Sequence, residues 1–266
     1  MARWARLAHG GGGAFGLMAE DGSVAIHRGD MFDRPTPTGE VVPADAVHLR
    51  TPVRPGKFIG LWNNFHELAT KQGNTIPAEP LFFLKAPSSI IGPDIPIRPP
   101  AAYAGRVIYE GELGIVIGSR ISNADEAEAA AAIFGYTCVN DVTASDILTA
   151  DPAFPQWARA KSPDSFGPAG PWIETTFDLA AARVRVLLNG RERQNYPLSD
   201  MILPPSRIVA LLSREMTLEP GDLIACGTSV GALPMRPGMI VEVVIDGIGT
   251  LRNLFDPPGA PTETPA

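Results

Sequence analysis

The clearest strand in the sequence spans residues 106–118 and has the sequence RVIYEGELGIVIG. Side chains on a strand point alternately to its two faces. Leu113, Ile115 and Ile117 therefore share one face while Val116 lies on the other, which predicts a strand that is mainly buried. The fold is expected to be built around this strand.

Short strands and turns are expected over most of the chain, which contains 27 glycines and 27 prolines. Asn189-Gly190 is typical of a type I′ turn and predicts a hairpin over residues 182–196. Because strands outnumber helices, we predict an α+β, β-rich fold with a mixed, rolled or barrel-like sheet. The expected helices span 63–72, 125–134 (ended by Gly135) and 204–215, and the other expected strands span 58–62, 81–84, 136–140, 223–226, 240–245 and 250–254.

Three segments are expected along the chain. Residues 1–52 form a small β-rich N-terminal domain, with a hairpin turn at Glu20-Asp21-Gly22. Residues 53–256 form the main domain, and residues 257–266 form a proline-rich tail that is expected to be mobile.

Composition excludes several classes of protein. The net charge of −7 gives no basic face, so we expect no nucleic-acid partner. No run of about 18 apolar residues is present and the N-terminus lacks the apolar core of a signal peptide, so we expect a cytoplasmic protein without a membrane partner. Cys138 and Cys226 are expected to be buried free thiols.

Two glutamates in the central strand, Glu110 and Glu112, are two residues apart and share one face. Like charges beside an apolar sheet are costly unless a cation neutralises them. Asp141, at the end of the strand 136–140, could complete a set of oxygen ligands for Mg²⁺, Mn²⁺ or Ca²⁺. The alternatives are a solvated edge-strand pair for the glutamates and an Asx turn or helix N-cap for Asp141.

Other residues are candidates for acid–base chemistry or anion binding. His66 beside Glu67 could activate water, and Lys85, which follows an apolar run, could stabilise a carboxylate or an oxyanion, as could Lys161. The turn over residues 227–231 could bind a carboxylate through its backbone N–H groups. The alternatives are a surface histidine, solvated lysines and an ordinary tight turn. No GxGxxG, P-loop or G-x-S-x-G motif is present, so neither a nucleotide cofactor nor a serine nucleophile is supported.

Taken in order, several segments between residues 56 and 254 resemble the fumarylacetoacetate hydrolase family. Each motif alone is weak, whereas the ordered set is specific. The segments are residues 109–118 (YEGELGIVIG), 82–89 (FFLKAPSS) with 91–93, 134–144 (FGYTCVNDVTA), 159–162 (RAKS) with 170–173, 216–222 (MTLEPGD) with 227–228, and 247–253 (GIGTLRN).

The resemblance implies a mixed β-roll fold, a homodimer, and Mg²⁺ or Mn²⁺ bound by Glu110, Glu112 and Asp141. It implies that Lys161 lies near the metal and the substrate carbonyl, and that His66 corresponds to the family histidine. The residues expected to contact the substrate are Lys85, Tyr109, Gly227 and Thr228. Substrates of the family are 2-oxo acids, β-diketo acids or their enols.

The chain departs from the family pattern near the expected base. Many members have a glutamate three residues after the histidine, whereas this chain has Ala69 and carries Glu67 next to His66. Ser145 replaces a common arginine, and Ser229 replaces the usual proline after Gly-Thr. These departures concern the base and the substrate contacts and leave the expected metal ligands intact.

The expected function is metal-dependent hydrolysis of a C–C bond in an acylpyruvate or β-diketo acid through a metal-stabilised enolate, with His66 and Glu67 activating water. One alternative is decarboxylation or keto–enol isomerisation of a 2-oxo dicarboxylic acid in aromatic catabolism, which the absent glutamate weakens less. A second alternative, from another class, is a non-catalytic protein that binds a metal and small carboxylates.

Overall fold

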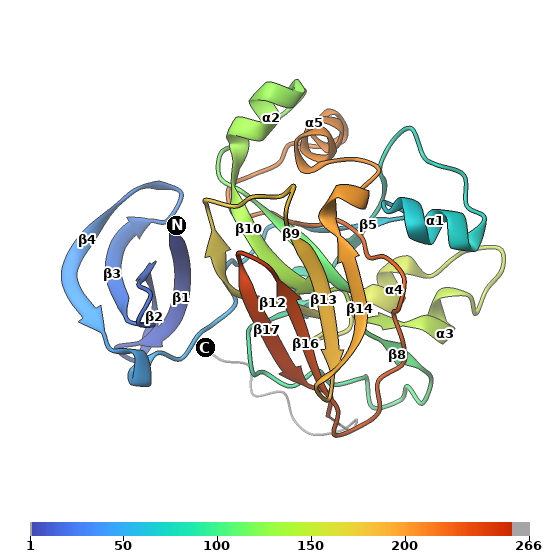
Figure 1. Ribbon diagram of the computed structural model, residues 1–266, viewed down its shortest axis with the longest axis horizontal. Helices are drawn as coiled ribbons and strands as arrows, with labels where there is room; N and C mark the ends of the chain where they lie inside the picture. The colour runs from blue at the N-terminus through green and yellow to red at the C-terminus, as the bar shows by residue number, and fades with distance from the viewer. Residues whose placement is uncertain (1, 257–266) are drawn as a thin grey trace.

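The computed structural model describes residues 2–256, and most of its regular structure is strand (Figure 1). The predicted tail, residues 257–266, lies outside the described residues. One mixed sheet of 11 strands has the order β4-β3-β2-β1-β12-β10-β9-β15-β5-β6, with β7 beside β12. Within residues 2–256, the two ends of this order do not pair with each other, so the rolled sheet is not a closed barrel.

The first strands form an antiparallel unit at one side of the molecule (blue in Figure 1). The predicted hairpin turn at residues 20–22 connects its second and third strands. Its first strand also pairs with β12 of the main body through Arg3 opposite Glu174 and Trp4 opposite Ile173, so the unit extends the large sheet. The four strands are β1 (Arg3–His9), β2 (Gly12–Met18), β3 (Val24–Asp30) and β4 (Asp33–Val42).

The predicted central strand is buried but interrupted. All seven residues of β9 (Gly111–Ile117) are buried between β10 and β15. The preceding residues leave the sheet as β8 (Val107–Ile108), which pairs with β11 (Thr143–Ala144). The prediction of one strand over 106–118 was therefore wrong at Tyr109 and Glu110, which lie in the break. The other strands here are β5 (Phe58–Trp62), β6 (Leu81–Lys85), β7 (Ile90–Ile91), β10 (Ile133–Asn140), β12 (Gly167–Glu174) and β15 (Leu223–Ala225).

A second, four-stranded antiparallel sheet has the order β14-β13-β16-β17. Its first hairpin turns at Asn189 and Gly190, which both have positive φ (50° and 73°), as the predicted type I′ turn requires. Its strands are β13 (Arg183–Leu188), β14 (Arg191–Pro197), β16 (Ile240–Ile245) and β17 (Gly249–Leu254).

The core fills both sides of β9 and β10. Leu113 and Cys138 belong to the largest buried cluster, together with Val186 of the four-stranded sheet. Val116 and Val139 belong to a second cluster on the other face. Each such buried side chain contributes about 1.5–3 kcal/mol, so the central strands are rigid supports for whatever their ends carry.

Five α-helices lie in the described part of the chain: α1 (His66–Gln72), α2 (Glu126–Ala132), α3 (Ser145–Leu148), α4 (Trp157–Lys161) and α5 (Pro205–Glu215). Helix α1 begins later than predicted because Asn63 is left-handed, with φ of 59°. The sequence patterns gave no prediction of α3, α4 or β12. Short 3₁₀ turns, η1 (Ala44–Ala46), η2 (Pro87–Ser89) and η3 (Leu198–Asp200), complete the connections.

Gly135 does not end helix α2, which was a wrong prediction. The helix starts at an Asp125–Glu128 capping box and ends at Ala132, and Gly135 lies inside β10. A Cβ atom on Gly135 would lie 2.6 Å from the Glu174 carbonyl oxygen, so the glycine permits close approach of the neighbouring strand.

Cys138 and Cys226 are buried and free, as predicted. No helix in residues 2–256 is long and apolar enough to cross a membrane.

Candidate active site

Three carboxylates converge where β9 begins and β10 ends. The register pairs Asn140 with Gly111, so the next residues outward, Asp141 and Glu110, face each other. The Asp141 N–H donates to the Glu110 carbonyl at 2.8 Å. Strand alternation places Glu112 on the same side, and one oxygen of each of Glu110, Glu112 and Asp141 lies within 4.8 Å of the others.

Two buried lysines from separate elements meet these carboxylates. Lys161, the last residue of α4, donates to Glu110 at 2.9 Å and also to Asp141. Lys85, the last residue of β6, donates to Asp141 at 2.6 Å. The side chains of Lys161 and Lys85 are 3% and 0% exposed, so both ammonium groups depend on these carboxylates for partners. We call these five residues the carboxylate–lysine cluster.

The cluster shifts the pKa of its members in opposite directions. Burial, with the nearby charges of Asp141 and Glu110, raises the pKa of Glu112 well above its ordinary value. Burial also acts on Asp141, but the charges of Lys161 and Lys85 outweigh it and lower the pKa of Asp141. Despite burial, Asp141 and Glu110 raise the pKa of Lys161, whereas burial lowers the pKa of Lys85. Lys161 is therefore held as a cation and Asp141 as an anion.

The residues present fit a hard divalent cation. One oxygen of Glu112 accepts the Gly227 N–H at 2.7 Å, while its other oxygen is buried and has no hydrogen-bond partner within the described residues. A buried carboxylate oxygen without a partner is costly. Three carboxylates face two lysines, so an ionised Glu112 would leave one negative charge without a counter-charge. An all-oxygen donor set suits Mg²⁺, Mn²⁺ or Ca²⁺.

Two further polar residues that sequence analysis did not single out hold Glu110 in place. The Thr143 hydroxyl donates to the Glu110 carboxylate at 2.6 Å, and the Asn140 side chain accepts the Glu110 N–H at 3.0 Å. Both are buried and flank Asp141 in the chain. Polar residues at such short spacing around a buried aspartate were the signal that could have found them.

In the turn over residues 227–231, the Gly227 N–H binds the carboxylate of Glu112. Thr228 donates to the Gly111 carbonyl at 3.0 Å, so the turn is attached to the residue that lies between the two glutamates. The Tyr109 hydroxyl donates to the Gly231 carbonyl at 3.0 Å, and burial raises the pKa of Tyr109 to about 12. Tyr109 and Lys85 are buried, and both side chains form hydrogen bonds within the protein. That Lys85, Tyr109, Gly227 and Thr228 contact the substrate stays a prediction.

The predicted base lies apart from the carboxylate–lysine cluster. His66 and Glu67 form the exposed first turn of α1, and the Glu67 N–H donates to Asp200 at 3.0 Å. Within residues 2–256, no hydrogen bond joins the His66 ring to a carboxylate. Ala69, at the position of the family glutamate, is buried. The catalytic role of His66 and Glu67 stays a prediction.

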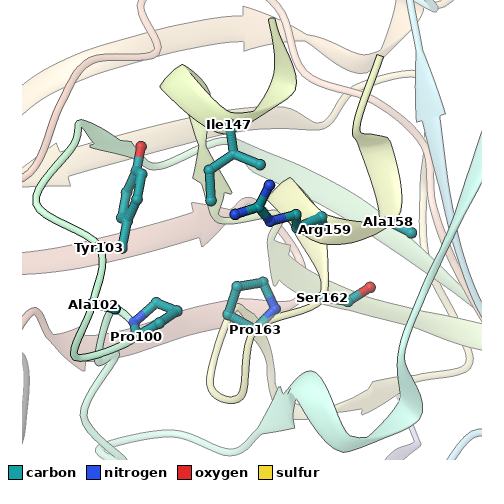
Figure 2. A pocket seen from close by; sticks show the side chains of 8 residues that line it. All are labelled: Pro100, Ala102, Tyr103, Ile147, Ala158, Arg159, Ser162 and Pro163. Carbon is teal, nitrogen blue, oxygen red and sulfur yellow. The ribbon is translucent and has the colours of Figure 1, made fainter. Parts of the chain in front are cut away.

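A separate pocket of about 390 Å³ lies between α3, α4 and the segment before β8. Figure 2 shows the Arg159 side chain extending into it from α4. Arg159 and Lys161 are two residues apart on this helix and point in roughly opposite directions, so the pocket and the carboxylate–lysine cluster lie on different sides of α4. The pocket is lined by Pro100, Ala102, Tyr103, Ile147, Ala158, Arg159, Ser162 and Pro163.

A rolled, mixed sheet that presents a buried carboxylate triad and two lysines defines a scaffold that could hold a divalent cation. Comparison with known proteins identifies the scaffold. The chain belongs to the fumarylacetoacetate hydrolase family: the model "Fumarylacetoacetate (FAA) hydrolase C-terminal" matches residues 57–255. The model "Rv2993c-like, N-terminal" matches residues 2–52. Members of the family are enzymes.

Individual relatives agree with this assignment. The chain is 43% identical to Protein Rv2993c of Mycobacterium tuberculosis over 84% of this chain and 83% of that protein. It is similar to the crystal structure of 2-hydroxyhepta-2,4-diene-1,7-dioate isomerase from Mycobacterium marinum, with 37% identity, a TM-score of 0.89, and coverage of 98% and 100% of the two chains. It is also similar to maleylpyruvate hydrolase from Sphingobium sp. SYK-6 in complex with manganese(II) and pyruvate, with 27% identity, a TM-score of 0.78, and coverage of 97% and 100%. The fold prediction is therefore confirmed.

Proposed function

We propose that the protein is a divalent-cation-dependent enzyme that hydrolyses a C–C bond in an acylpyruvate or β-diketo acid. The observation that carries this proposal is the carboxylate–lysine cluster, in which Glu112 keeps an unpartnered buried oxygen beside a cationic Lys161. The similar maleylpyruvate hydrolase, whose structure contains manganese and pyruvate, supports it.

Glu110, Glu112 and Asp141 would hold the cation, Mg²⁺ or Mn²⁺. When bound there, such an ion supplies Lewis-acid polarisation of a carbonyl oxygen. Thr143 and Asn140 fix the orientation of Glu110, and Gly227 fixes that of Glu112. Lys85 holds Asp141 through an ion pair in which both side chains are fully buried.

Lys161 acts as a fixed positive charge. Its raised pKa keeps the ammonium group protonated, so it stabilises a developing oxyanion and does not remove a proton. Water activation falls to His66, with Glu67 beside it on α1. Both are exposed, and so they are free to reorient toward a bound substrate.

Isomerisation or decarboxylation of a 2-oxo dicarboxylic acid is the second candidate. Ala69 favours it, because this buried methyl group stands where many family members have a glutamate, and only hydrolysis needs a strong base for water. The similarity to an isomerase over 98% of the chain supports the same candidate.

A panel of acylpyruvates, oxaloacetate and unsaturated 2-hydroxy diacids, incubated with Mg²⁺ or Mn²⁺ and analysed by mass spectrometry, tests the proposal. Hydrolysis of a C–C bond yields two smaller acids whose masses sum to that of the substrate plus water, decarboxylation removes carbon dioxide, and isomerisation leaves the mass unchanged. The expected result is a cation-dependent conversion of an acylpyruvate into pyruvate and a carboxylic acid. Binding of these acids without any turnover would instead establish a non-catalytic carboxylate binder.

The homodimer that the resemblance implied is also a proposal. β6 is an end strand of the large sheet, and Leu81, Phe82 and Leu84 on it are exposed, as is the neighbouring Trp62. An apolar, unpaired strand edge favours association. Light scattering should give the mass of a dimer, and Leu84→Lys should shift it toward the monomer.

A further inference from the structure

We propose that Gln194 is a positioning residue that fixes the geometry of the cation site by joining Gly111 to the turn over residues 227–231. This inference rests on the proposed function, because it concerns the same three carboxylates. Gln194 comes from β14, in the four-stranded sheet, and thus from outside every segment that supplies a carboxylate or lysine to the cluster.

Gln194 is only 2% exposed, and its side-chain amide makes several polar contacts. Its oxygen accepts the Gly111 N–H at 3.1 Å. Its nitrogen donates to the Thr228 hydroxyl at 2.9 Å and to the carbonyls of Ser229 and Val230 at 3.1 and 3.3 Å. One side chain therefore joins Gly111, which lies between the two glutamates, to the turn that binds Glu112.

Gly111 lies between Glu110 and Glu112 in the chain, so a shift of this residue would move both carboxylates. Its carbonyl accepts hydrogen bonds from Thr228 and from Tyr196, the second inward-facing residue of β14. A Cβ atom on Gly111 would lie 2.2 Å from Val186 of the four-stranded sheet. The peptide is thus held on its N–H side, on its carbonyl side and at its α-carbon.

The chemistry of the contacts requires an amide at position 194. The oxygen end faces an N–H donor and the nitrogen end faces three oxygens. A glutamate of the same size would place a second oxygen against the carbonyls of Ser229 and Val230 and add a negative charge near three carboxylates. A methionine would fill the space and leave the Gly111 N–H without a partner.

The test measures Mn²⁺ affinity, by electron paramagnetic resonance of free Mn²⁺, and thermal stability in the full-length protein. Q194M is expected to weaken Mn²⁺ binding by about 10–100-fold, as for other residues that orient metal ligands. Asn253→Leu is the matched control: Asn253 is a buried amide on β17 whose nitrogen donates to the carbonyls of Gly92 and Ile95. It should lower the melting temperature like Q194M but leave Mn²⁺ affinity unchanged.

Q194E provides a second test if Q194M does not fold, and it should also lose Mn²⁺ affinity. Wild-type affinity in a folded Q194M or Q194E would overturn the positioning role. An equal loss of affinity in the Asn253 variant would overturn it as well, since general loosening would then explain the effect. If the wild-type protein binds no Mn²⁺, the cation site itself is wrong and the inference falls with it.

Discussion

The carboxylate–lysine cluster and the first turn of α1 differ in how firmly the fold holds them. Asp141, Lys85 and Lys161 are buried and joined by short ion pairs. Glu112 is also buried, and its carboxylate accepts the Gly227 N–H. His66 and Glu67, in contrast, are exposed and share no hydrogen bond with the cluster within the described residues. The half of the site that would hold a cation and an oxyanion is thus formed in advance, and the half that would activate water is not.

Membership of the family implies both cation binding and a particular reaction, and the two halves of the site bear on these properties separately. In the proposed function, cation binding would depend on the rigid half, which the central strands position. The choice among hydrolysis, decarboxylation and isomerisation would depend on the exposed half. Variants in the two halves should therefore have different effects.

The largest effect is expected for Glu110→Ala. Removing one of three carboxylates should abolish Mn²⁺ binding and, with it, all turnover, while the fold persists because Glu110 lies outside the strands. Titration with Mn²⁺ measures this. Glu219→Ala, which removes a surface carboxylate paired with Arg120, is the control and should change neither. Undiminished Mn²⁺ affinity in Glu110→Ala would refute the site.

His66→Ala tests the exposed half alone. If His66 activates water, kcat for hydrolysis should fall by about 10²–10⁴-fold, with Mn²⁺ affinity unchanged because, within residues 2–256, no hydrogen bond or ion pair links His66 to the cluster. His48→Ala, at another exposed histidine, should have no effect. A fall of less than about tenfold, well below the usual contribution of a general base, would favour isomerisation or decarboxylation.

Lys161→Met should lower kcat by about 10²–10³-fold, because it removes a fixed charge that stabilises the oxyanion. Unlike His66→Ala, it should do so for every reaction in the panel. The control is Lys57→Met, which breaks a similar ion pair with the buried Asp222 at 2.6 Å, away from the cluster. Retention of kcat in Lys161→Met would show that the lysine only neutralises the carboxylates.

The smallest effect concerns stability without metal. The folded-state pKa of Glu112 lies above the ordinary value of 4.5. Its contribution to stability is therefore complete below that value and is lost as the pH rises toward the raised pKa. At pH 8 and without metal, Glu112→Gln should raise the free energy of unfolding, while Mn²⁺ binding is lost.

Glu174→Gln gives the matched comparison by urea denaturation. Glu174 is equally buried, but it is paired with the Arg3 guanidinium at 3.6 Å. Removing its charge should lower stability. A decrease for Glu112→Gln at pH 8 would mean that the Glu112 charge is already neutralised by the protein.

The sequence predicts the rigid half better than the exposed half for physical reasons. Alternation around Leu113 and Ile115 identifies a buried strand, and the glutamates at its start are conspicuous there. The turn at Asn189-Gly190 follows from backbone conformation alone. Such local signals require no knowledge of distant contacts.

The remaining features depend on tertiary contacts. The break at Tyr109 and Glu110 exists because β8 pairs with β11. Gly135 resembles a helix-ending residue in the sequence, but in the structure it permits close approach of a neighbouring strand. The two glycines and two prolines of β12 conceal a strand that is stabilised by both neighbours. Gln194 carries no motif, since its partners are 34 or more residues distant.

The pairing of β1 with β12 has a practical consequence for how the protein can be divided. The two family models meet near residue 52, which invites expression of the second part alone. Such a fragment would expose a bare strand edge at β12 and the apolar face that Trp4, Phe15 and Met31 cover. Aggregation of that fragment would thus reflect the uncovered strand edge and would not show that residues 57–255 are unstable in the intact protein.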